Sequence, residues 1–320
     1  MDNRLGFLWA PCPGGARLLR LFGDSPCPDL PPRIAGLPLV EVGPYCFAAR
    51  ERPAPDARFW AAQGGPEEFS HAICGDFVRR VTLPDPVRIL HSAAFYNCRA
   101  LEELCVGPGI ESLGSDLFTN CRLQRFVLRS TPHAATGLKK LLGAVTADIG
   151  VAFCPNGTVA ALLFYPEYFE YLDENTPAHI FNRSIEGEGY RYRQCFDGGV
   201  LNFAEYDAAF ARACDSETEP TLCQIALGRL RAPYALSAGA QAAYAGYLKV
   251  HPGPAVAAVT AARDAAGLRL LCQQELLDAD ARRNAALLCG QEGWSEGATL
   301  LLGDPQKRRS APKRYDFEDF

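Results

Sequence analysis

Apolar and polar residues follow a pattern along residues 81–125 that occurs twice, with a period of 23 residues. Each copy opens with a strand-like alternation, Val81-Thr82-Leu83 or Leu104-Cys105-Val106, and continues with apolar residues at wider spacing. The recurring pairs are Val81/Leu104, Leu83/Val106, Val87/Ile110, Leu90/Leu113, Phe95/Phe118, Asn97/Asn120 and Cys98/Cys121. A fixed period of this length predicts a solenoid, in which each unit buries its apolar face only against its neighbours.

A third copy precedes these two. The step of five residues from Val42 to Phe47 matches the step from Leu90 to Phe95. In the two clear copies, one phenylalanine per repeat predicts that Phe95 and Phe118 stack in register as the spine of the core. N-terminal to this copy, two short apolar segments at 7–9 and 16–22 flank a Pro-Gly-Gly sequence, which predicts a β-hairpin.

The recurring positions are expected to be structural, because solenoid cores are built from such positions. Asn97 and Asn120 are polar in both copies, and we expect their side chains to satisfy buried turn backbone. The structural repeat positions are Leu83, Val87, Leu90, Phe95, Asn97, Cys98, Ile110, Leu113, Phe118, Asn120 and Cys121.

The motif L-P-x-x-V-x-x-L-x-x-x-x-F-x-N-C in residues 83–98 resembles the leucine-rich repeats of the BspA-like family. The second copy has Gly107 where the motif has proline. The resemblance covers roughly residues 16–130 and implies a short leucine-rich-repeat solenoid with a binding role. Members of the family are often surface or adhesion proteins. Here Pro11 and Pro13 interrupt the apolar stretch near the N-terminus, so we expect a cytoplasmic protein.

Residues 50–69 interrupt the repeats and are rich in proline and glycine. We expect this segment of the solenoid domain (residues 1–130) to be an inserted loop, because long insertions in solenoids lie on one face and often bind. Trp60 is the candidate anchor for a partner; the alternative is that it packs back onto the core.

After residue 130 the period disappears. Residues 131–215 predict an α+β cap, with helical spacing at 136–146 and a hairpin at 149–165 whose turn is Asn156-Gly157. We expect the cap to cover the last strand of the solenoid, which would otherwise be unpaired.

The segment 165–210 is dense in aromatic, arginine and acidic residues, and Gly187 and Gly189 interrupt any helix, so much of it is expected to be loop. If the chain has a ligand site, we place it here, because loops on a rigid frame carry function. Arginines would hold a carboxylate or phosphate; alternatively Arg and Glu side chains pair with each other. The candidate binding residues are Trp60, His179, Arg183, Glu186, Glu188, Arg191 and Arg193.

Residues 216–303 have helical spacing throughout and predict a module of helical hairpins. Gly267-Leu268 returns as Gly297-Ala298, which resembles the stacking of ankyrin-type helix pairs. The remaining residues, 304–320, form a polar tail with a basic cluster, typical of a frayed terminus.

The net charge, the length of the apolar runs and the cysteine spacing argue against several classes of protein. A net charge of −5 and a pI near 5.6 argue against a nucleic-acid partner, and the chain lacks an apolar run of membrane-spanning length. The 13 cysteines lack paired spacing, so we expect small buried thiols and no metal. Nucleotide-binding, metalloprotease and serine-hydrolase motifs are absent, and we expect no cofactor.

Together these features predict an α+β protein: a short leucine-rich-repeat solenoid, an α+β cap and a C-terminal α-helical module. The function we infer is a non-enzymatic scaffold whose partner is another protein. The alternative is an enzyme or small-molecule sensor with its site in residues 165–210.

Overall fold

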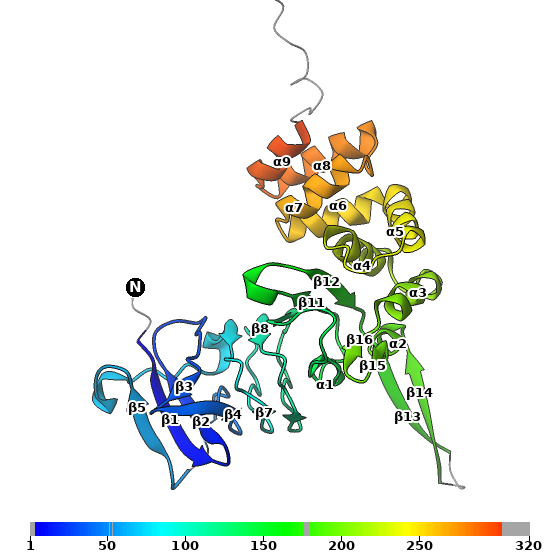
Figure 1. Cartoon of the computed structure of the whole chain (residues 1–320). Helices are drawn as coiled ribbons and strands as arrows, with labels where there is room; N and C mark the ends of the chain where they lie inside the picture. Colours follow the sequence, from blue (N-terminus) through cyan, green and yellow to red (C-terminus); the bar gives the residue numbers. More distant parts are fainter. Residues whose placement is uncertain (1–3, 51, 53, 176–178, 303–320) are drawn as a thin grey trace, which may run out of the picture. The chain divides into compact units, whose positions relative to one another are not determined.

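The computed structural model describes residues 4–50, 52, 54–175 and 179–302, with two compact units among them (Figure 1). The first unit comprises the described residues of 1–218 together with 232–240. The second comprises 219–231 and the described residues from 241 onward. The architecture is mixed α+β, as the sequence predicts, and the tail 304–320 lies outside the described residues.

The first sheet of the repeat array begins with the N-terminal hairpin. Its strand order is β5-β1-β2-β4-β7-β9. The short strand β3 pairs with β4 in addition to this order. The strands are β1 (Gly6–Cys12), β2 (Gly15–Phe22), β3 (Arg33–Ile34), β4 (Leu37–Val42), β5 (Arg58–Ala61), β7 (Ile89–Leu90) and β9 (Ser112–Leu113). The expectation of a loop at 50–69 missed β5, which pairs antiparallel with β1 and is followed by a 3₁₀ turn, η1 (Pro66–Glu68). A second such turn, η2 (Gly75–Phe77), precedes the next repeat.

The second sheet runs along the other side of the repeats, in the order β12-β11-β10-β8-β6. Its strands are β6 (Arg80–Thr82), β8 (Glu103–Val106), β10 (Arg125–Leu128), β11 (Ile149–Phe153) and β12 (Ala161–Tyr165). The pairs β6–β8 and β8–β10 are parallel. The two repeats of residues 81–125 therefore each contribute one strand to each sheet, β6 with β7 and β8 with β9, as expected for a solenoid.

The phenylalanine spine is confirmed. The rings of Phe47 and Phe95 stack with centroids 4.9 Å apart, and those of Phe95 and Phe118 with centroids 5.7 Å apart. The thiols of the repeated cysteines link the turns: Cys98 Sγ donates to the Phe47 carbonyl and Cys121 Sγ to the Phe95 carbonyl. Burial raises the pKa of Cys121 to about 11, so this thiol stays protonated and can donate.

The repeated asparagines have a different role from the expected one. Asn97 and Asn120 have φ angles of 59° and 60°, in the left-handed region that asparagine tolerates better than most residues. Their side chains are not buried against turn backbone; Asn120 Nδ2 donates to Asn97 Oδ1 at 2.7 Å near the surface. The expectation was therefore wrong, because the turn needs this backbone conformation and leaves the amides to form a ladder.

The cap covers only one of the two sheets. Helix α1 (Leu138–Gly143) leads into the β11–β12 hairpin, whose connection includes a 3₁₀ turn, η3 (Pro155–Gly157), with Asn156 and Gly157 at positive φ. Strand β11 pairs parallel with β10, so the second sheet continues past the last repeat. The first sheet ends at β9.

Residues 165–210 are more ordered than the sequence suggested. The elements are β13 (Phe169–Asn175), β14 (Ile180–Glu186), α2 (Gly189–Tyr192), β15 (Phe196–Asp197), β16 (Val200–Leu201) and α3 (Phe203–Ala213). The pair β13–β14 is a two-stranded hairpin that extends away from the rest of its unit (Figure 1). The expectation that much of this segment is loop was therefore wrong.

The second unit is helical, as predicted. Its helices are α4 (Glu219–Arg231), α5 (Ala238–Val250, whose first residues belong to the first unit), α6 (Pro252–Ala261), α7 (Ala265–Gln273), α8 (Ala279–Gln291) and α9 (Ser295–Leu302). Contacts of α6 with α8 and of α7 with α9 stack one helix pair on the next. Within the described residues, no helix combines the length and the apolar character that crossing a membrane requires.

Candidate functional site

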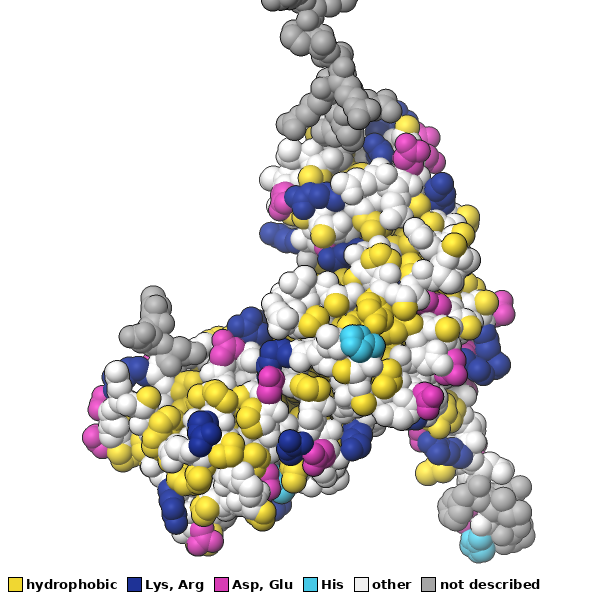
Figure 2. Space-filling model, viewed as in Figure 1, with side chains coloured by type: hydrophobic (Ala, Val, Ile, Leu, Met, Phe, Trp, Pro, Cys, Tyr) yellow, Lys and Arg dark blue, Asp and Glu magenta, His cyan; other side chains and the backbone are white. Residues whose placement is uncertain are grey.

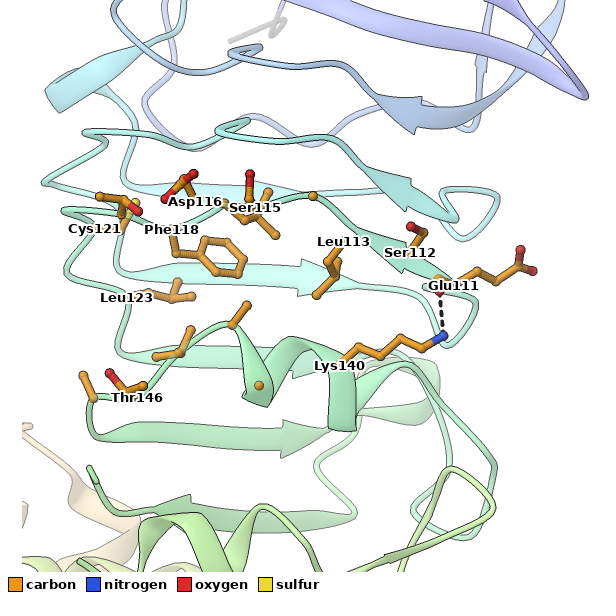
Figure 3. Close-up of a pocket in the computed structure, with 17 residues that line it drawn as sticks. Glu111, Ser112, Leu113, Ser115, Asp116, Phe118, Cys121, Leu123, Lys140 and Thr146 are labelled. Atoms are coloured by element: carbon orange, nitrogen blue, oxygen red, sulfur yellow. Dashed lines mark hydrogen bonds between the residues drawn. The ribbon is translucent and has the colours of Figure 1, made fainter. Parts of the chain in front are cut away.

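A groove of about 770 Å³ lies at the uncapped end of the first sheet (Figure 3). One wall is the last repeat turn, residues 111–119 with Cys121 and Leu123; the other is Lys140 and residues 143–147, at and after the end of α1. Phe118 and Leu123 lie on its floor in Figure 3. We call this site the edge groove.

Exposure rises at this end of the array because no further repeat covers it. Leu90 and Phe95 are fully buried, whereas Leu113 is half-buried and Phe118 is 8% exposed. The edge groove therefore presents the side chains that a following repeat would otherwise bury.

Among the described residues, backbone N–H and carbonyl groups at this end of the array also lack the hydrogen-bond partners that a following repeat would supply. Three alternate N–H groups of the repeat that holds Phe95 donate to the carbonyls of the next repeat: Ala93 to Ser115, Phe95 to Leu117 and Asn97 to Thr119, at 2.9, 3.2 and 2.9 Å. The N–H groups 23 residues further on, those of Asp116, Phe118 and Asn120, have no acceptor within the described residues. The Leu90 carbonyl accepts from Gly114, and the corresponding Leu113 carbonyl likewise has no donor in the described part of the chain.

At one position of the last repeat, the Glu111 carbonyl, a lysine side chain supplies the hydrogen bond that a following repeat would otherwise make. In the array, the Arg88 N–H donates to the Val40 carbonyl and the Glu111 N–H to the Arg88 carbonyl. At the end of the series, Lys140 Nζ donates to the Glu111 carbonyl at 2.6 Å (Figure 3). The α1 lysine thus closes one corner of the edge, and the groups at 113–120 remain open.

Trp60 packs against the core. It lies on β5, half-buried, with its ring centroid 5.4 Å from that of buried Phe7. It also lines a smaller pocket of about 390 Å³ with Arg4 and Asp29. Its position fits the core alternative, with one side accessible.

Arg193 is 2% exposed and is surrounded by backbone carbonyls. Its guanidinium donates to the carbonyls of Leu142, Val145, Ala147, Pro166 and Gly189. The carbon Cζ lies 5.0 Å from the ring centroid of Tyr168. Arg193 therefore holds together α1 with the residues after it, the connection that follows β12, and α2. Its geometry does not suit it to bind an external anion.

Glu188 and Arg191 pair with each other. Glu188 is largely buried and accepts from Arg191 Nε and Arg212 Nε, both at 2.9 Å. Its N–H donates to Glu217 Oε1 at 2.7 Å, and burial raises the pKa of Glu217. A pocket of about 450 Å³ lined by both arginines and Glu205 lies beside this network. The arginine charges are balanced by carboxylates, as the alternative of mutual pairing proposed.

The other three candidates lie on the β13–β14 hairpin. Arg183 pairs with Glu170 at 2.6 Å across the strands, and His179 with Glu174 at 2.7 Å. Glu186 faces Phe169 in the register. The structure therefore distributes the sequence-derived candidates over the N-terminal sheet, a buried network and the hairpin, and does not bring them into one cleft.

A partly buried cluster of charged side chains on the N-terminal sheet, Glu41 with Arg17 and His91, resembles a catalytic site, but its members pair with each other. Glu41 is 5% exposed, with Arg17 Nε 2.5 Å and His91 Nε2 2.8 Å from its Oε2. Burial raises the pKa of Glu41, but hydrogen bonds from His91 and Arg17 outweigh it and hold that pKa below its ordinary value. Burial, with the Glu41 charge, raises the pKa of neighbouring Cys12 to about 11, so its thiol is not an activated nucleophile.

Comparison with known protein families gives a match within the array. A family model described as a BspA type leucine rich repeat region (6 copies) matches residues 68–135. Residues 68–135 are a BspA-type leucine-rich repeat region. No curated protein and no solved structure matches the chain. In the part of the chain that the structure describes, no group of three or more His, Cys, Asp or Glu side chains is placed to hold a metal.

The leucine-rich repeat region supplies one wall of the edge groove, and α1, directly after the matched residues, supplies the other. Sequence reasoning missed this site because it treated every repeated residue as core. A signal was available: the strand pattern has no counterpart to Ser112-Leu113 one period later, at 135–136.

Proposed function

We propose that this protein is a protein-interaction scaffold whose edge groove binds an extended segment of a partner protein. Leucine-rich repeat arrays provide rigid surfaces for binding, and the matched region places such an array here. The observation that carries the proposal is the row of open backbone groups at Asp116, Phe118 and Asn120, with the Leu113 carbonyl beside them.

The chemistry of the row fits a strand. The open N–H groups lie at alternate residues of the turn that follows β9, and an extended segment laid along this turn would satisfy them as an added strand does at a sheet edge. Main-chain hydrogen bonds would supply affinity. The half-buried side chain of Leu113 and the largely buried side chains of Phe118 and Leu123, which line the groove, would select apolar residues of the partner. The groove volume is that of a site for several side chains rather than a gap in packing.

A peptide-display experiment tests this proposal. Random peptides would be selected on the immobilised full-length chain, and amide hydrogen exchange would then be measured with and without a selected peptide. We expect the amides of Asp116, Phe118 and Asn120 to become protected. Failure to select any peptide, or binding that leaves these three amides exchanging as before, would refute the proposal.

A blocking variant provides the second readout. Gly143 lines the groove, and a Cβ added there would meet no atom within 4 Å, so a Gly143→Trp side chain can begin at this position without a clash and would occupy part of the groove. The control is Gly290→Trp, also near a helix C-terminus with open space around its Cβ. We expect about tenfold or greater loss of peptide affinity for the first variant and no change for the control.

A further inference from the structure

The β13–β14 hairpin exposes large apolar side chains on a pair of strands that has no third strand and no covering layer in the described structure. Leu172 is 72% exposed, Phe169 52% and Tyr171 46%. Figure 2 shows apolar side chains beside charged ones where the hairpin leaves its unit. A hairpin of two strands is marginally stable alone in water, and exposed apolar patches on one indicate an interaction surface.

The two faces of the hairpin differ in their charges. On one face Arg183 and Glu170 neutralise each other. The other face carries Phe169, Tyr171 and Asp173 at alternate positions of β13, with Ser184 and Glu186 opposite on β14. Asp173 and Glu186 have no ion pair among the described residues. We call this second face the acidic face.

The surrounding sequence strengthens the negative charge. Residues 167–186 hold five carboxylates and one arginine, a net charge of −4 with histidine neutral. An acidic surface repels a second copy of itself, and it repels nucleic acid and anionic membrane surfaces in the same way. Charge complementarity therefore selects a basic partner.

The spacing indicates the form of that partner. Alternate residues of a strand lie about 7 Å apart on one face, and the aromatic and acidic side chains of β13 follow this spacing. Each strand of the hairpin has one unpaired edge in the described structure, to which an extended segment can add. We infer that the acidic face binds an extended segment of a partner protein in which Lys or Arg alternates with apolar residues.

The acidic face and the edge groove share no residues, so the two binding proposals can be tested independently. The probe is a short fluorescent peptide of alternating Lys and Val, and its counterpart is alternating Glu and Val. Fluorescence anisotropy with the full-length chain should show binding of the basic peptide alone, with affinity that falls as salt is raised. Equal binding of both peptides, or of neither, would overturn the inference.

Two variants localise the binding. Asp173→Lys with Glu186→Lys should weaken binding of the basic peptide about tenfold or more, since like charges then face each other. The matched control, Asp56→Lys with Glu67→Lys, makes the same change in net charge at two exposed carboxylates and should change affinity less than about twofold. Equal losses in both variants would mean that net charge alone drives binding and would refute the inference.

Tyr171→Ser tests the aromatic contribution without a change in charge and should weaken binding by severalfold, with circular dichroism confirming the fold. Gly143→Trp should leave this binding unchanged, which separates it from the edge groove. A concentration-dependent dimer that Tyr171→Ser abolishes, in a chain that does not bind the basic peptide, would identify a second copy as the occupant and refute the inference.

Discussion

Replacing a phenylalanine of the spine by alanine should cost stability in proportion to how completely its ring is enclosed. Phe95 is fully buried between Phe47 and Phe118, with ring centroids 4.9 and 5.7 Å away. Phe118 is also flanked by two rings, Phe95 and Phe126, but it lies on the floor of the edge groove and is 8% exposed. The two positions therefore separate ring stacking from cavity formation.

The magnitudes follow from that difference. Phe→Ala in a core costs about 3–5 kcal/mol, and part of the cost is the cavity left behind. At Phe95 the cavity is closed on all sides, so we expect about 4 kcal/mol. At Phe118 the space opens into the edge groove and water can occupy it, so we expect about 1 kcal/mol less, or about 3 kcal/mol.

Urea unfolding monitored by tryptophan fluorescence measures both values. Trp9 and Trp60 belong to the first unit and Trp294 to the second, so a Trp294→Phe background restricts the signal to the unit that holds the repeats. Phe169→Ala, on the exposed hairpin, is the matched control and should change stability by less than about 0.5 kcal/mol. A loss below about 1 kcal/mol at Phe95, or a larger loss at Phe118 than at Phe95, would refute the enclosed-spine reasoning.

Two further predictions concern charged groups that the structure assigns to the frame. Arg193→Met should destabilise the first unit by at least about 3 kcal/mol in the same assay, since it removes the guanidinium that donates to five backbone carbonyls. Arg183→Met removes an exposed ion pair and should cost less than about 1 kcal/mol, and equal effects would contradict the assignment. Glu41 has a folded pKa below its ordinary value of 4.5, so its stabilising contribution is complete above the unfolded pKa and is lost as pH falls through the folded pKa. The stability difference between the native chain and Glu41→Gln should therefore be largest above about pH 5 and shrink on acidification, and a difference that grows toward low pH would reverse the sign we assign.

The chemistry-bearing residues were harder to interpret than the repeats. Arg193 and Arg183 lie in the same segment of the sequence, which is rich in aromatic and acidic residues. Arg193 is nevertheless enclosed by backbone carbonyls, whereas Arg183 lies on an exposed hairpin. Residue type indicates what a guanidinium can bind, and only the chain path decides whether backbone, a carboxylate or solvent reaches it. Of the residues 165–210 for which the sequence suggested binding, we therefore propose only those of the acidic face of the hairpin, because they are exposed and carry negative charge that is unpaired in the described structure.

The amino-acid sequence by itself determined the repeat architecture, because a period of 23 residues places Phe118 over Phe95. The five-residue step that Val42–Phe47 shares with Leu90–Phe95 identifies the copy whose Phe47 stacks on Phe95. It also determined the β11–β12 hairpin and the helices of the second unit, whose signals are local. The tertiary structure alone decided where the array stays open. Which strand pairs with the last repeat depends on the route the chain takes after residue 130. That route covers β10 and leaves the outer edge of β9 without a partner strand in the described structure. Side-chain periodicity specifies how neighbours stack; it carries no information about an edge to which no neighbour is added.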